Sequence, residues 1–177
     1  MKNAKVLFAG FGGQGILFMG KVVAYAGMIG EKNVSWLPSY GPEMRGGTAN
    51  CSVILSDIPV AAPMVTYPNL LVAMNKPSLD CFIDNVERGG EVFLDSSLIE
   101  EKVEMAEVKA YYIPATKLAD EHGYQGLANM VMLGKILKET GLMSLEELEA
   151  GLKKSIPASK AHLLEANLKA VRLGMEN

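Results

Sequence analysis

A glycine-rich turn between two apolar segments constrains the fold of this 177-residue chain most strongly. Residues 4–9 are apolar apart from Lys5 and suit a buried strand, and residues 14–30 have the length and apolar content of a helix. Where the strand gives way to the helix, Gly10, Gly12 and Gly15 stand in the spacing GxGxxG. This order predicts the first unit of an α/β sheet, with unpaired amides at the helix start that favour a phosphate or another anion.

The turn leaves three interpretations open: a dinucleotide site, a site for another anion or a partner chain, or a purely structural turn. A dinucleotide site needs an acidic residue at the end of the second strand, about 20 residues further on, for the ribose hydroxyls. Glu31 precedes the expected second strand, 33–37, and Glu43 follows well after it. Gly20 and Gly27 lie on one face of the expected helix and permit close packing, which supports the structural interpretation.

Further strands and helices continue the alternation. Strands are expected at 48–55, 69–74, 90–95 and 107–113, and a helix from Pro77 to about Val86. Continuous apolar runs such as LLVAM indicate strands buried on both faces, as parallel sheets require. We therefore expect a single α/β domain over residues 1–177, with a mostly parallel sheet and helices on both faces.

Roughly the last 50 residues are expected to be helical. Ser144 and Glu147 fit a capping box, and leucines recur on one face of the helix that begins there. Pro157 suits the first turn of a final helix, which Gly174 is expected to end. These helices need an apolar surface, and either the sheet or a partner chain supplies it.

Charge and composition exclude several classes of protein. The net charge of −3 and the pI near 5.5 leave no basic surface for nucleic acid, and the scattered lysines and arginines form no polybasic membrane patch. No apolar run approaches the roughly 20 residues that cross a bilayer, and the N-terminus lacks a signal-peptide pattern. We expect a cytoplasmic protein.

Residues that commonly bind metals or catalyse reactions are sparse. Cys51 and Cys81 have no CxxC spacing, so they indicate neither a disulfide framework nor a zinc or iron–sulfur site, and we expect two buried thiols. His122 and His162 are the two histidines, and each suits a surface or capping position. We expect no catalytic and no metal-ligating residue in this chain.

The segment SWLPSYGPEMRGGTANCS, residues 35–52, contains a second candidate site at the same edge of the sheet as the glycine turn. The prolines and glycines at its centre define a shaped loop. Arg45, beside two glycines, presents a guanidinium group for a carboxylate or phosphate, with Glu43 to orient it and Tyr40 to add a flat face. Pairing of Arg45 with Glu43 alone is the alternative.

Several motifs together resemble one family. GFGGQGI, WLPSYGPEMRGGTANCSVILSD, AMNKPSLD and GLANMVMLG look like the gamma subunit of the 2-oxoacid:ferredoxin oxidoreductases over nearly the whole chain. PSYGPEMRGG is far more specific than the glycine spacing. The chain most resembles the 2-oxoglutarate enzymes (2-oxoglutarate synthase), and the branched-chain 2-oxoacid enzymes, which act on 2-oxoisovalerate, follow closely.

This resemblance implies a complex that decarboxylates a 2-oxoacid on thiamine diphosphate and magnesium, reduces ferredoxin through iron–sulfur clusters and releases an acyl-CoA. The chain lacks motifs for thiamine and for clusters, so we expect these cofactors in the alpha, beta and delta subunits and no activity from the isolated chain. A free-standing NAD(P)-dependent oxidoreductase is the enzymatic alternative.

The resemblance also implies that the glycine turn and the second loop contact coenzyme A or a partner subunit. Asn75 and Lys76 follow another strand and are expected to border the same crevice, or else to serve as a turn residue and a solvated lysine. The candidate residues for contacts with CoA or with a partner subunit are Gly10, Gly12, Gly13, Gln14, Gly15, Tyr40, Glu43 and Arg45.

Overall fold

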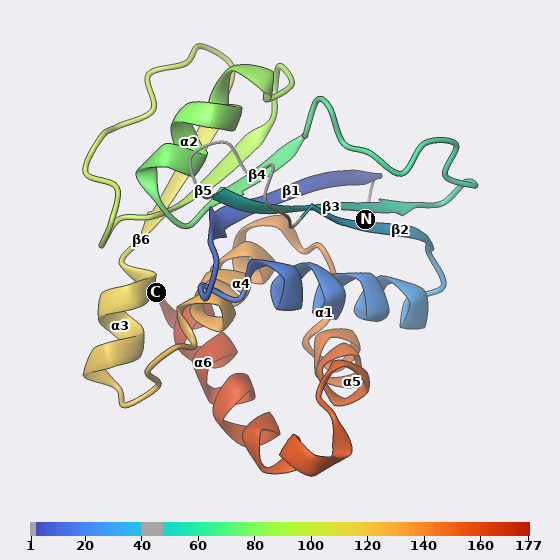
Figure 1. Cartoon of the computed structure of the whole chain (residues 1–177). Helices are drawn as coiled ribbons and strands as arrows, with labels where there is room; N and C mark the ends of the chain where they lie inside the picture. The colour runs from blue at the N-terminus through green and yellow to red at the C-terminus, as the bar shows by residue number, and fades with distance from the viewer. Residues whose placement is uncertain (1–2, 40–47) are drawn as a thin grey trace.

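A six-stranded sheet with helices on both faces organises the computed structural model, which describes residues 3–39 and 48–177 (Figure 1). The strands are β1 (Ala4–Phe11), β2 (Asn33–Ser39), β3 (Thr48–Ser56), β4 (Leu70–Ala73), β5 (Glu91–Asp95) and β6 (Lys109–Ile113). The α-helices are α1 (Ile16–Ile29), α2 (Lys76–Phe82), α3 (Ala115–Glu121), α4 (Ala128–Thr140), α5 (Leu145–Ser155) and α6 (Leu164–Glu176). Short 3-10 helices, Ile83–Asn85 and Ala158–Leu163, follow α2 and precede α6.

The strand order is β2-β3-β1-β4-β5-β6. The pairs β1–β4, β4–β5 and β5–β6 are parallel, whereas β3 pairs antiparallel with both β1 and β2. Among the described strands only β3 therefore runs against the rest, and the mostly parallel sheet is confirmed. β3 runs antiparallel to β2 because the segment that connects them, 40–47, is shorter than the dozen or so residues that a parallel crossover needs.

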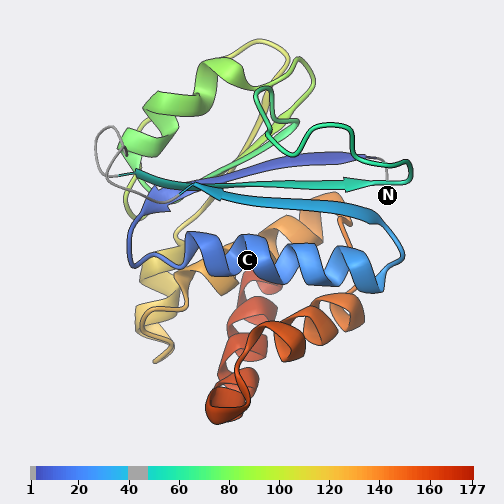
Figure 2. The same cartoon turned by 45° about the vertical axis from the view of Figure 1, so that its right-hand side comes forward.

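Helix α1 lies close against the sheet because of two glycines. A Cβ atom at Gly20 would lie 2.4 Å from the Sγ atom of Cys51, and one at Gly27 would lie 2.4 Å from a methyl group of Leu55. Both neighbours belong to β3, so the expected close packing is confirmed, with the sheet as the partner. The C-terminal helices lie on the same face as α1, and α2 covers the opposite face (Figures 1 and 2).

The helical C-terminal part begins as expected and ends differently. The capping box of α5 is confirmed, since the Oγ atom of Ser144 accepts a hydrogen bond from the N–H of Glu147 at 3.1 Å and the carboxylate of Glu147 accepts one from the N–H of Ser144 at 2.7 Å. Pro157 precedes a 3-10 helix, and α6 starts only at Leu164. The expected end at Gly174 is wrong, because α6 continues to Glu176 and Gly174 contacts α4 instead.

Two further differences concern short helices. The helix expected from Pro77 to about Val86 is α-helical only as far as Phe82 and then tightens into the 3-10 helix. Helix α3 was not expected, since its seven residues are too few to display a clear 3.6-residue period.

No helix in residues 3–39 or 48–177 has the length and hydrophobicity that a membrane span requires.

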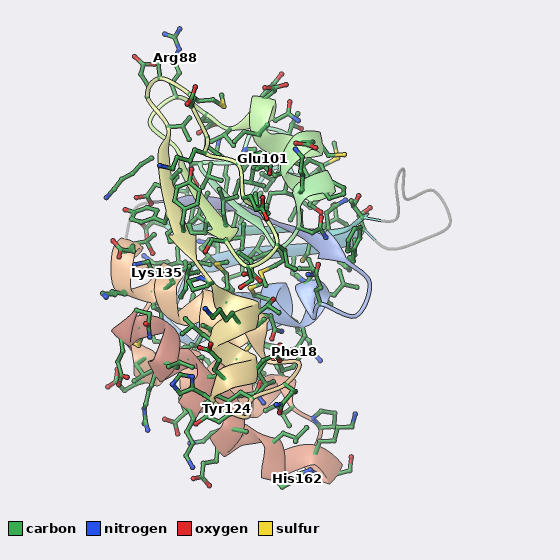
Figure 3. All side chains as sticks on the ribbon, turned by 90° about the vertical axis from the view of Figure 1, so that its left-hand side faces the viewer. Phe18, Arg88, Glu101, Tyr124, Lys135 and His162 are labelled. Atoms are coloured by element: carbon green, nitrogen blue, oxygen red, sulfur yellow. The ribbon has the colours of Figure 1, made fainter. Side chains whose placement is uncertain are left out.

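Both histidines occupy positions of the expected kind. The Nδ1 atom of His122 lies 2.9 Å from the carbonyl oxygen of Leu118 at the end of α3, which makes it a capping residue. His162 is exposed in the 3-10 helix before α6, at the far end of the helical layer from the sheet (Figure 3).

The two thiols differ in exposure, so the expectation of two buried thiols is wrong for Cys81. Cys51 is buried between β3 and α1, whereas Cys81 is exposed on α2. Burial raises the pKa of the Cys51 thiol to about 12, against a smaller lowering by its hydrogen bond with Trp36. Because the thiolate is the reactive form, Cys51 stays protonated and unreactive in the folded chain.

We expect iodoacetamide at about pH 8 to alkylate Cys81 alone in the folded chain and both cysteines after unfolding in guanidinium chloride. Intact-mass spectrometry counts the adducts, and Cys81→Ser serves as the control that remains unmodified while folded. Rapid modification of Cys51 in folded Cys81→Ser would contradict its burial.

Candidate functional site: the glycine turn and the adjoining strand end

The glycine turn lies where the sheet changes its direction of winding. From β1 the chain passes through α1 to β2 and β3 on one side, and β4 pairs with β1 on the other. The helices that follow β1 and β4 lie on opposite faces of the sheet (Figure 1). This arrangement opens a crevice beyond the carboxyl ends of β1 and β4, which is where open α/β sheets bind ligands.

Gln14 ties the two strand ends together. Its Oε1 atom accepts hydrogen bonds from the N–H of Phe11 at 2.7 Å and from the Nδ2 atom of Asn75 at 2.9 Å. Its Nε2 atom donates to the carbonyl oxygen of Met74 at 3.0 Å. One side chain thus fixes the turn after β1 against the residues that follow β4, and the shape of the crevice depends on it.

The glycines of the turn divide into two structural and two open positions. A Cβ atom at Gly10 would lie 2.6 Å from Ile16, and one at Gly15 would lie 2.3 Å from the side chain of Asn129, so these two glycines allow the turn to pack. Gly12 and Gly13 are exposed, and a Cβ atom on either would have no neighbour within 4 Å. Gly13 has a φ of +92°, a backbone conformation that residues with a Cβ atom rarely adopt, so the backbone and not the packing favours glycine there.

The open glycines leave polar backbone accessible. Within the described part of the chain, no hydrogen bond occupies the amide N–H groups of Gly12 and Gly13. They stand just before α1, where the helix dipole adds a positive potential. Backbone amides in this setting bind phosphate or carboxylate oxygens without any charged side chain.

A cavity of about 200 Å³ adjoins the turn. It is lined by Gly13, Gln14, Met74, Leu98, Thr116, Ala119, Asp120, Gly126 and Ala128. Pockets for whole small molecules usually measure about 300–1,000 Å³, so this cavity suits one end of a ligand or a side chain of another protein.

Asn75 and Lys76 have different roles in the structure. Asn75 is buried, contacts Gln14 and accepts a hydrogen bond from the N–H of Ser78 at 2.9 Å, so it borders the crevice and also caps α2. The ammonium group of Lys76 lies 2.9 Å from Asp80 and 3.2 Å from Glu101, and these two hydrogen bonds, Asp80 first, raise its pKa. Lys76 therefore fits the alternative of a solvated, ion-paired lysine.

The second candidate loop is described only at its ends. Tyr40, Glu43 and Arg45 lie outside the described residues. The residue before the undescribed segment, Ser39, pairs with Asn50, and the residue after it, Thr48, pairs with Phe11 at the start of the glycine turn. The expectation that this loop leaves the sheet at the edge of the glycine turn is confirmed for both of its ends.

The topology does not favour the dinucleotide interpretation. In dinucleotide-binding sheets the strand next to β1 is parallel to it, and the acidic residue that binds the ribose stands at its carboxyl end. Here β3 occupies that place and runs antiparallel, so its first residue, Thr48, lies beside the turn. The last described residue of β2 is Ser39, which carries no charge.

Sequence reasoning missed Asp95, a buried carboxylate near the crevice. It stands at the end of β5 and accepts hydrogen bonds from the Oγ1 atom of Thr116 at 2.5 Å and from the N–H of Ser97 at 3.0 Å. Thr116 is one of the residues that line the cavity, so Asp95 fixes the start of α3 beside it. An acidic residue directly after the apolar run VFL was the available signal.

Within residues 3–39 and 48–177, no three or more histidine, cysteine, aspartate or glutamate side chains gather in a way that suits a metal ion. The described site contains backbone amides, the amide side chains of Gln14 and Asn75, the hydroxyl of Thr116 and the carboxylate of Asp120. The amides and the hydroxyl can bind anions and polar groups, whereas the carboxylate favours a hydrogen-bond donor or a cation.

Comparison with protein families and curated proteins gives consistent matches. The family model described as pyruvate ferredoxin/flavodoxin oxidoreductase matches residues 5–177. Ketoisovalerate oxidoreductase subunit VorA of Methanothermobacter thermautotrophicus is 40% identical, over 98% of this chain but only 36% of that protein. 2-Oxoglutarate synthase subunit KorC of the same organism is 36% identical, over 97% of this chain and 93% of that protein. The chain thus spans about a third of VorA and nearly all of KorC.

Solved structures agree with this pattern. The gamma subunit of the keto/oxoacid ferredoxin oxidoreductase from Geobacter sulfurreducens superposes with a TM-score of 0.81 at 28% identity, covering 98% of this chain and 96% of that chain. The 2-oxoglutarate:ferredoxin oxidoreductase from Magnetococcus marinus, solved with 2-oxoglutarate, coenzyme A and succinyl-CoA bound, gives a TM-score of 0.86 at 25% identity. That match covers 99% of this chain and 31% of the Magnetococcus chain.

Proposed function

Since the chain belongs to the pyruvate ferredoxin/flavodoxin oxidoreductase family, we propose that it is the gamma subunit of a CoA-acylating 2-oxoacid:ferredoxin oxidoreductase. The proposed complex converts 2-oxoglutarate to succinyl-CoA and carbon dioxide and reduces ferredoxin. The observation that carries the proposal is the end-to-end match with KorC subunits, at 34–36% identity over 92–95% of their length in three archaea.

The subunit has a supporting role in this proposal. Thiamine diphosphate with its magnesium and the iron–sulfur clusters are assigned to the alpha, beta and delta subunits, because the described residues offer no metal-binding group and the two cysteines differ in place and exposure. The isolated chain is then inactive, and it works in the cytoplasm with ferredoxin as an indirect partner. Thiamine supplies the decarboxylation chemistry in another subunit.

The glycine turn is the proposed contact for an anionic group of CoA or of a partner subunit. The open amides of Gly12 and Gly13 supply two donors, and Gln14 holds them in place. Arg45, with Tyr40 and Glu43, belongs to a segment whose flanking residues lie beside this turn. A guanidinium group added to two amides suits a phosphate or a carboxylate.

We expect Arg45→Ala to raise the KM for CoA in the assembled complex about tenfold or more, the effect of losing a charge-assisted hydrogen bond. The measurement is CoA-dependent reduction of a viologen dye at saturating 2-oxoacid. Arg88→Ala is the matched control, because Arg88 is exposed at the far end of the molecule from the helical layer (Figure 3). An unchanged KM together with an unchanged yield of complex would remove Arg45 from the site.

The branched-chain substrate remains the second candidate because VorA relatives reach 40% identity. The two candidates are separated by capturing the complex from native extract through a tag on this chain. The captured fraction is then assayed with 2-oxoglutarate, 2-oxoisovalerate and pyruvate in turn. Preference for 2-oxoglutarate supports the first proposal, and preference for 2-oxoisovalerate replaces it with the second.

A further inference from the structure

A second cavity, of about 460 Å³, lies between the start of α1, the start of α4 and the segment that joins α5 to α6. Pockets that bind whole small molecules usually measure about 300–1,000 Å³, so this cavity is large enough for one. It shares Gly126 with the cavity beside the glycine turn, but Gly13 and Gln14 do not line it. The two cavities are therefore neighbours with different walls.

Apolar side chains make up much of the wall of the second cavity. They come from the start of α1, the start of α4 and the segment between α5 and α6: Phe18, Leu127, Ile156, Pro157 and Leu163. Phe18, Leu127 and Ile156 also pack against the main core, which fixes this wall before any ligand binds. A ligand for the cavity therefore has an apolar body.

Asn167 of α6 adds a buried polar group to this wall. It is 4% exposed, and its Nδ2 atom donates a hydrogen bond to the carbonyl oxygen of Leu163 at 2.8 Å. Within the described residues its Oδ1 atom has no hydrogen-bond partner. Ser78 has the one fully enclosed side-chain atom of that kind in the described chain, so the Oδ1 atom of Asn167 is open to the cavity that it lines. A buried oxygen without a partner is costly, and a ligand that donates a hydrogen bond to it removes that cost.

The walls of the cavity come from segments without acidic residues. No aspartate or glutamate occurs in residues 4–30, 122–138 or 150–164, which supply every lining residue except Asn167. Four acidic residues flank the second and third segments, and each pairs with a lysine: Glu121 with Lys117, Glu139 with Lys135, Glu149 with Lys153, and Glu165 with Lys169. These segments thus bring no unpaired negative charge to the cavity, although the net charge of the chain is −3.

Two lysines line the cavity, Lys21 of α1 and Lys160 of the 3-10 helix before α6. Neither makes an ion pair within the described residues. The ammonium group of Lys21 lies 5.8 Å from the centre of the Tyr25 ring, a contact that leaves its charge without a counter-ion. Unpaired ammonium groups beside an apolar cavity attract the acid group of a ligand.

We propose that the second cavity binds a small organic acid that has an apolar body and a hydroxyl group. The acid group pairs with Lys21 or Lys160, the apolar body contacts the wall that includes Phe18, and the hydroxyl donates to the Oδ1 atom of Asn167. This site is separate from the contact proposed for the glycine turn, and it does not rest on the proposed function. A bound acid joins α1 to the C-terminal helices and stabilises the folded chain.

The test uses the full-length chain and three matched compounds. Para-hydroxyphenylpropionate has all three groups, its amide lacks the charge, and phenylpropionate lacks the hydroxyl. Ligand-detected NMR measures the dissociation constant of each compound with the wild-type chain and with the double variant Lys21→Met, Lys160→Met. The charge-matched control is Lys102→Met, Lys138→Met, because both of these lysines are exposed and lie outside the cavity. The melting temperature of each chain reports its folding.

We expect the wild-type chain to bind para-hydroxyphenylpropionate with a Kd of about 1 mM or below. The amide should bind at least about tenfold more weakly, and phenylpropionate about threefold more weakly or worse. The cavity variant should bind the acid at least about tenfold more weakly than wild type, and the control should bind it like wild type, with both melting close to wild type.

Three results overturn the proposal: no binding to the wild-type chain, equal binding of the acid and its amide, or equal loss of binding in both double variants. Displacement of the bound acid by CoA assigns the cavity to the proposed CoA contact and overturns a separate site. An inactive complex, which would remove the proposed function, leaves all of these measurements on the isolated chain unchanged.

Discussion

Gly174→Ala is expected to destabilise the isolated chain by about 3 kcal/mol or more, at the upper end of the cost of overpacking a core. A Cβ atom at Gly174 would lie 1.8 Å from the carbonyl oxygen of Val131, and one at Gly134 would lie 1.9 Å from that of Val171. Helices α4 and α6 thus cross with their backbones in contact. A methyl group at this point forces the helices apart along their whole interface, since backbone atoms cannot rotate away as a side chain does.

Chemical unfolding in urea, followed by circular dichroism, measures this loss. The matched control is Gly12→Ala, because a Cβ atom there would have no neighbour within 4 Å and Gly12 does not have a positive φ. We expect the control to change the free energy of unfolding by less than about 0.5 kcal/mol. A Gly174→Ala chain as stable as wild type would mean that α4 and α6 do not cross as closely as described.

Gln14→Ala is expected to cost about 2–4 kcal/mol of stability and also to impair CoA use by the complex. The substitution leaves the N–H of Phe11, the carbonyl oxygen of Met74 and the amide of Asn75 without their shared partner. Water satisfies part of this loss because Gln14 is only half-buried. The turn after β1 is then no longer fixed to β4, so the amides of Gly12 and Gly13 lose their common orientation.

The control for Gln14 is Gln125→Ala. Gln125 is exposed, and its side chain makes one long hydrogen bond, 3.4 Å to the carbonyl oxygen of Asp120. Its replacement should change stability by less than about 0.5 kcal/mol. A Gln14→Ala subunit that keeps wild-type stability and a wild-type KM for CoA would show that the bridge between the strand ends has no role in the site.

The α/β layout and the glycine turn could be predicted from the sequence because both are local patterns. An apolar run, a turn of glycines and an amphipathic or apolar helix each depend on neighbouring residues only, as does the capping box of Ser144 and Glu147. The role of Gly174 could not be predicted in this way. A glycine near a helix end reads as a stop signal, and the neighbour that explains it, Val131, is 43 residues earlier in the chain (174 minus 131).

Part of the layout of the candidate site could be predicted for the same reason, whereas the role of its residues in binding stays a prediction. Gln14 was a candidate because it stands inside the glycine motif, but its partner Asn75 comes from another strand end, and only the parallel pairing of β1 with β4 brings the two together. The antiparallel course of β3 was not expected, although it places Thr48 beside the turn. Asp95 and Thr116 meet across β5 and α3, which no short-range pattern encodes.

The central claim, that this chain is a supporting subunit of a 2-oxoglutarate:ferredoxin oxidoreductase, is tested most directly by reconstitution. The alpha, beta and delta subunits of the complex are purified without this chain and assayed for CoA-dependent viologen reduction with 2-oxoglutarate, before and after the chain is added. We expect little activity from either part alone and full activity from the mixture, with the chain eluting in the complex. Full activity without the chain, or a chain that never joins the complex, would contradict the account.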